Sequence, residues 1–97
     1  MSEALSAART REAVARARLA EAVAEQARAR REAERLEGRS ILPGADPAMA
    51  EAAQQQRTLV ERATSSIDAI RAQLRRAEAD VVTIEAASDL DRSSPAG

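Results

Sequence analysis

A regular heptad pattern in the second half of the chain limits the fold more than any other feature. Between residues 49 and 84, a four–three spacing recurs without interruption, and all but one of its positions are apolar. The positions are Met49, Ala53, Gln56, Val60, Ala63, Ile67, Ile70, Leu74, Ala77, Val81 and Ile84. Such spacing places a single stripe, here called the seam, along an α-helix, and a seam of about five heptads is typical of a coiled coil.

The first half of the chain carries a weaker version of the same pattern. Its seam includes Leu19 and Gln26, but most of its other positions are alanine. Residues 3–37 contain no Gly or Pro and consist largely of strong helix formers. We therefore expect a first helix over about residues 3–37, with Ser2 as its N-cap and Gly38 as a left-handed C-terminal cap.

A cluster of helix-breaking residues separates the two patterns and predicts a loop over residues 38–46. We predict that Asp46 is the N-cap of a second helix. Pro47 follows it, and the missing backbone N–H of a proline costs nothing at the first helical position. This second helix is expected over about residues 47–87. The segment 88–97 is rich in Ser, Asp and Pro, and we predict a flexible tail there.

The short connection favours antiparallel packing, so residues 1–87 are predicted to form an all-α, two-helix coiled-coil hairpin. Folding near residue 41 brings Gln26 opposite Gln56, and a paired amide satisfies both side chains. An unpaired buried amide costs ~1–3 kcal/mol. The alternative register, one heptad further on, aligns Arg9 with acidic residues of the second helix in exposed ion pairs, which stabilise weakly. We therefore predict the register that pairs the two glutamines.

The predicted hairpin has too little apolar volume to be stable alone. Leu, Ile and Val total 16 of the 97 residues, against 25 alanines and no Phe. Domains of fewer than roughly 100 residues are marginal even with fuller cores. Four further apolar residues lie off the seam: Val14, Val23, Leu59 and Val82. We expect a second copy, with a homodimer favoured, or a helical protein partner to cover the hairpin and complete a four-helix bundle.

The loop contains two apolar residues, Ile41 and Leu42. Apolar loop side chains are usually buried, so they are expected to plug the end of the hairpin. The alternative is a hydrophobic tip that docks a partner.

The composition excludes most catalytic chemistry. With no Cys and no His, the chain lacks thiolate nucleophiles, the commonest general base and the commonest metal ligands. Two helices build no pocket for a small-molecule substrate, and we expect no enzyme activity, no cofactor and no metal. No apolar run is long enough to span a membrane. The N-terminus lacks a signal-peptide core, which predicts a cytoplasmic protein or export by a signal-peptide-independent secretion system.

An arginine-rich segment near the end of the first helix is the clearest candidate for anion binding. Its arginines are Arg28, Arg30, Arg31, Arg35 and Arg39. Glutamates interleave with them at helical spacing, as in Glu25–Arg28 and Arg31–Glu34, so local pairing is expected to cancel much of the charge. We interpret the segment as a solvated, ion-paired helix face, with nucleic-acid or anionic-surface binding as a disfavoured alternative.

Two secretion-related families offer a resemblance. The predicted hairpin resembles the small Trp-x-Gly hairpin proteins of type VII secretion, although this chain has neither Trp nor Tyr. Asp46-Pro47-Ala48, with Gln54 beyond it, is similar to the start of the second helix in type III secretion needle proteins. These likenesses imply an exported subunit, a needle-like component or its chaperone as the alternative function. The leading hypothesis is a non-enzymatic interaction or structural module that acts through its heptad seam.

Overall fold

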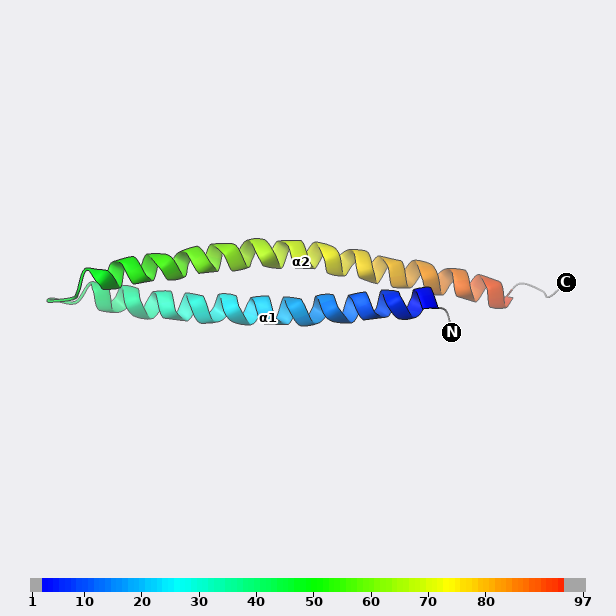
Figure 1. The fold of residues 1–97 in the computed structure, drawn as a ribbon, viewed down its shortest axis with the longest axis horizontal. Coiled ribbons are helices and arrows are strands. Elements are labelled where there is room, and N and C mark those ends of the chain that lie inside the picture. The colour runs from blue at the N-terminus through cyan, green and yellow to red at the C-terminus, as the bar shows by residue number, and fades with distance from the viewer. Residues whose placement is uncertain (1–2, 94–97) are drawn as a thin grey trace.

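The computed structural model describes residues 3–93 and consists of two long antiparallel helices packed side by side (Figure 1). Helix α1 spans Glu3–Ser40 and helix α2 spans Ala48–Ser93. The molecule measures 84 × 15 × 14 Å, so it is a narrow rod. The all-α helical hairpin predicted from the sequence is confirmed. The predicted Ser2 cap, and residues 94–97 of the predicted tail, lie outside the described residues.

The end of α1 differs from the prediction that Gly38 caps it. The helix continues to Ser40, and Gly44, with φ of 78°, is the glycine that adopts the left-handed conformation. Pro43 gives the physical reason, because a proline disfavours the helical conformation at the residue before it. The chain therefore stays helical through Gly38 and turns only where Pro43 and Gly44 require it.

The start of α2 follows the prediction, whereas its end does not. The side chain of Asp46 accepts a hydrogen bond from the backbone N–H of Ala48 at 2.9 Å, so Asp46 is confirmed as the N-cap. At the other end, α2 continues to Ser93, six residues beyond the expected end of the helix. This last part of α2 extends past the start of α1 (Figure 1).

The core is a line of small side chains between the helices. The predicted seam residues of both helices are buried or half-buried, from Met49 to Ile84 in α2 and at Leu19 and Gln26 in α1. At the end of the hairpin opposite the loop, Leu5 and Ala8 form a cluster with Val81, and Ile84 packs against it. Six residues of α1 are fully buried, and five of them are alanine. The seam residues are thus used mainly in packing the two helices against each other.

The predicted register is wrong by one heptad. Gln26 donates a hydrogen bond to the hydroxyl of Thr64 at 2.8 Å, and Gln56 is not its partner. Arg9 pairs with Glu85, which is the alternative register considered above. The physical reason is that both glutamines are only half-buried. Water reaches their amides, so pairing them avoids little desolvation cost, and the ion pairs and apolar contacts decide the register.

The predicted loop plug is also wrong. The backbone N–H groups of Leu42 and Ala45 donate to the carbonyls of Arg39 and Leu42, at 3.2 and 3.1 Å, which closes a tight turn. In this turn Ile41 is 83% exposed and Leu42 is 59% exposed. The hairpin is too narrow to shelter them, since its two helix ends leave no open core to cover.

Candidate interaction face

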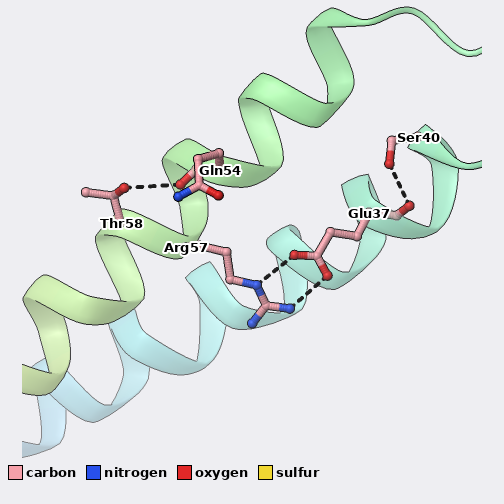
Figure 2. A network of polar contacts seen from close by, with 5 residues as sticks. All are labelled: Glu37, Ser40, Gln54, Arg57 and Thr58. Carbon is pink, nitrogen blue, oxygen red and sulfur yellow. Dashed lines mark hydrogen bonds and ion pairs between the residues drawn. The ribbon is translucent and has the colours of Figure 1, made fainter.

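One edge of the hairpin is closed by polar contacts between the helices, and we call it the ion-paired edge. Near the loop, the guanidinium of Arg57 donates two hydrogen bonds to the carboxylate of Glu37, at 2.7 and 2.8 Å (Figure 2). Near the end of the hairpin opposite the loop, Arg9 donates a hydrogen bond to Glu85 at 2.7 Å. In both helices the two paired residues are four heptads apart, so both pairs lie on the same edge of the supercoil.

The paired side chains Glu37 and Arg57 shift each other's pKa values. The hydrogen bonds from Arg57 lower the pKa of the Glu37 carboxyl below its ordinary value of 4.5. The same hydrogen bonds raise the pKa of Arg57, with nearby Glu34 adding to the effect. The pair joins α1 and α2 at the loop end of the hairpin.

The opposite edge, here called the open edge, carries two grooves between the helices. The larger groove has a volume of about 770 Å³ and the smaller about 450 Å³. The larger is lined by Ala22, Glu25, Arg28, Ala29, Arg31, Glu32, Arg35, Gln56, Leu59, Arg62, Ala63 and Ser66. The smaller is lined by Thr10, Arg11, Val14, Ala15, Arg18, Gln73, Arg76, Ala77 and Asp80.

Heptad spacing places both grooves on the same side of the rod. In α1, Arg11 and Arg18 of the smaller groove are spaced by multiples of seven from Glu25 and Glu32 of the larger one. Leu59, Ser66, Gln73 and Asp80 repeat the same interval along α2. Within residues 3–93, no ion pair links the two helices on this edge. The hairpin is thus closed on one side and open on the other.

The predicted arginine segment is divided between the two edges. Arg28, Arg31 and Arg35 line the larger groove. Arg30 lies three heptads from Arg9 and therefore belongs to the ion-paired edge. Arg39 is next to the turn, where its carbonyl accepts the N–H of Leu42.

The expected local pairing within this segment is mostly absent. Arg35 pairs with Glu32, and the hydrogen bond between them lowers the pKa of the Glu32 carboxyl. The predicted pairs Glu25–Arg28 and Arg31–Glu34 do not form among the described residues. The positive charge of the segment is therefore less cancelled than the spacing suggests.

Sequence reasoning missed the arginines outside this segment that line the grooves, which are Arg11, Arg18, Arg62 and Arg76. They are scattered in the sequence, so no cluster marks them. What marks them is their position relative to the seam. Arg11 and Arg18, for example, lie one heptad apart, and each directly precedes a seam position. The heptad positions beside the seam therefore identify these arginines, whereas the local density of arginine does not.

No group of three or more acidic side chains within residues 3–93 is placed to hold a metal ion. Neither described helix is long and apolar enough to cross a membrane. In comparisons with known proteins, no family model, no curated protein and no solved structure matches the chain.

Proposed function

We propose that this chain is a non-enzymatic interaction or assembly module, a helical hairpin whose open edge is covered by helices of another molecule. The observation that carries the proposal is the contrast between the edges. On the ion-paired edge, the Arg9–Glu85 and Glu37–Arg57 pairs join the two helices. The open edge leaves two alanine-floored grooves flanked by Val14 and Leu59, which are both exposed.

The amount of exposed surface supports the same proposal. The molecule exposes 7074 Å², whereas a compact protein of 10.3 kDa exposes about 5,400 Å². Large seam residues such as Val60, Ile70 and Leu74 are only half-buried. Further helices along the open edge would cover the exposed Val14 and Leu59 and form a four-helix bundle. Two occupants fit this role, either a second copy of the chain or a different helical protein.

The test is the molar mass of the chain by size exclusion with light scattering and refractive-index detection, combined with thermal unfolding followed by circular dichroism. We expect either a mass above that of one 10.3 kDa chain or a monomer that unfolds below about 45 °C, at the weak end for ordinary domains. A monomer that remains fully helical above about 65 °C would contradict the proposal, because such a hairpin needs no partner.

Two valines of α1 supply a matched pair of variants. Val14 lies on the open edge and Val23 lies two heptads from Arg9 on the ion-paired edge, and they are 43% and 42% exposed. If the chain self-associates through its open edge, Val14→Glu should reduce the mass to that of a monomer and Val23→Glu should not. Equal effects of the two substitutions would place the interface elsewhere.

A further inference from the structure

We propose that the open edge binds an acidic amphipathic helix of another protein. The apolar stripe of that helix lies on the alanine floor of the two grooves, and its carboxylates meet the arginines on both rims. This inference rests on the proposed function and adds the chemistry of the partner.

The shape of the edge suits a helix. The floor consists of small side chains, among them Ala15 and Ala77 in the smaller groove and Ala22, Ala29 and Ala63 in the larger. Small side chains let another helix approach closely, and they leave room on the groove floor for a leucine or isoleucine of that helix. The two grooves together extend over residues 10–35 of α1, or about 39 Å of helix.

The charge of the edge identifies an acidic ligand. The two grooves are lined by seven arginines and only three carboxylates, although the whole chain has a net charge of −1. Of the seven, only Arg35 makes an ion pair within the described residues, with Glu32. The other six are held beside an apolar floor without a carboxylate partner, in the described structure, and attract carboxylates presented on both flanks of a docking helix.

Two other ligands fit the edge less well. A second copy packed face to face would bring the same excess of arginine against itself, and like charges across an interface are unfavourable. Nucleic acid would place phosphates beside Glu25, Glu32 and Asp80, which interrupt the arginines on both rims. The chain also has no aromatic residue on which bases could stack. A helix with carboxylates at chosen positions avoids these three acidic residues, whereas a regular phosphate backbone does not.

The probe is a fluorescently labelled synthetic peptide of 28 residues, about 42 Å as a helix. Its own heptads carry leucine at the two core positions and glutamate at the positions that flank them. A twin peptide carries lysine in place of each glutamate. Binding to the full chain is followed by fluorescence anisotropy at several salt concentrations. We expect the acidic peptide to bind at least tenfold more tightly than its twin and to weaken as salt increases, because exposed charges are screened.

Charge-reversal variants locate the site. The double variant Arg18→Glu with Arg62→Glu removes one unpaired arginine from each groove and should weaken binding of the acidic peptide at least tenfold. The control is Arg30→Glu with Arg71→Glu, which changes the same charge on two exposed residues at heptad positions of the ion-paired edge. We expect this control to change the affinity less than about twofold.

Three results would overturn the inference. The first is equal binding of the two peptides, or no binding of either. The second is a double-stranded DNA of 20 base pairs that binds more tightly than the acidic peptide and displaces it, which would assign the edge to nucleic acid. The third is a dimer that Val14→Glu dissociates and that excludes the peptide. In this last case a second copy occupies the edge, so the proposed interaction function stands while the acidic partner is rejected.

Discussion

Single residues in this hairpin act mainly through backbone conformation and exposed charge, because few side chains are deeply buried. Gly38 is an example, since it lies inside α1, and apart from its chain neighbours and the nearby backbone of its own helix no atom lies within 4 Å of the position that a Cβ would take. Glycine in a helix interior costs about 1 kcal/mol relative to alanine. No contact or backbone strain explains its presence at this position. Gly44 differs, because its φ of 78° is one that other residues adopt at a cost.

These two glycines give opposite predictions for the same substitution. Gly38→Ala should raise the free energy of unfolding by about 1 kcal/mol, because it adds helix propensity without a clash. Gly44→Ala should lower it by about 1–2 kcal/mol, because alanine is strained at positive φ. Urea unfolding followed by circular dichroism measures both values. A destabilised Gly38→Ala variant would mean that α1 ends at Gly38, as the sequence alone suggested.

The Glu37–Arg57 pair predicts a dependence of stability on pH. The pKa of Glu37 is lowered in the folded chain, so its stabilisation is present above the unfolded value near 4.5 and is lost as the pH falls through the folded value. Glu37→Gln should therefore lower Tm slightly at pH 7, and the difference from the parent chain should disappear in strong acid as the parent carboxyl becomes protonated. Glu61→Gln, at an exposed carboxylate of α2, is the control and should have little effect at either pH. A Tm difference that persists in acid would show that Glu37 acts through packing.

At the scale of the helices, the seam holds α1 and α2 together with unequal contributions. Most buried residues of α1 are alanine, so the larger side chains of α2 supply most of the apolar contact. Ile67 is only 4% exposed, the most buried of the large side chains. Removing its side-chain volume, or placing a charge there, should affect the helices along their whole length.

We expect Ile67→Asp to abolish most of the helical circular dichroism signal and any self-association, because a buried charge without a partner is strongly unfavourable. The milder Ile67→Ala should cost about 2–5 kcal/mol, enough to unfold a marginal hairpin. Ser65→Asp adds the same charge two residues away on an exposed position and should leave the helicity intact. Unchanged assembly in Ile67→Asp would separate the association surface from the seam entirely.

The helices themselves were predictable from the sequence, since the four–three spacing between Met49 and Ile84 and the Asp46-Pro47 start signal are local. The register was not, because it depends on how much water reaches Gln26 and Gln56, which spacing does not reveal. The exposure of Ile41 and Leu42 depends likewise on the width of the rod. The grooves of the open edge follow from the register, so their lining across the two helices could not be predicted before the register was known.

At the scale of the whole molecule, the hairpin is long and thin. Its radius of gyration is 22.2 Å, whereas a compact chain of 97 residues has about 13 Å. A molecule with so much surface for its mass has little buried core of its own, so its stability depends on what packs along its sides. A partner bound to the open edge, as proposed, would therefore also stabilise the fold.

The positions of the outer helix ends have a mechanical consequence. The start of α1 and the last part of α2 lie at the same end of the rod, opposite the loop (Figure 1). Tension applied to both ends would separate the helices as a zipper opens, breaking the Arg9–Glu85 pair and the Leu5–Val81 contact first. Each further heptad would then yield in turn, because the load falls on one small group of contacts at a time. The hairpin is therefore weak as a tether between two attached loads, and better suited to hold objects apart.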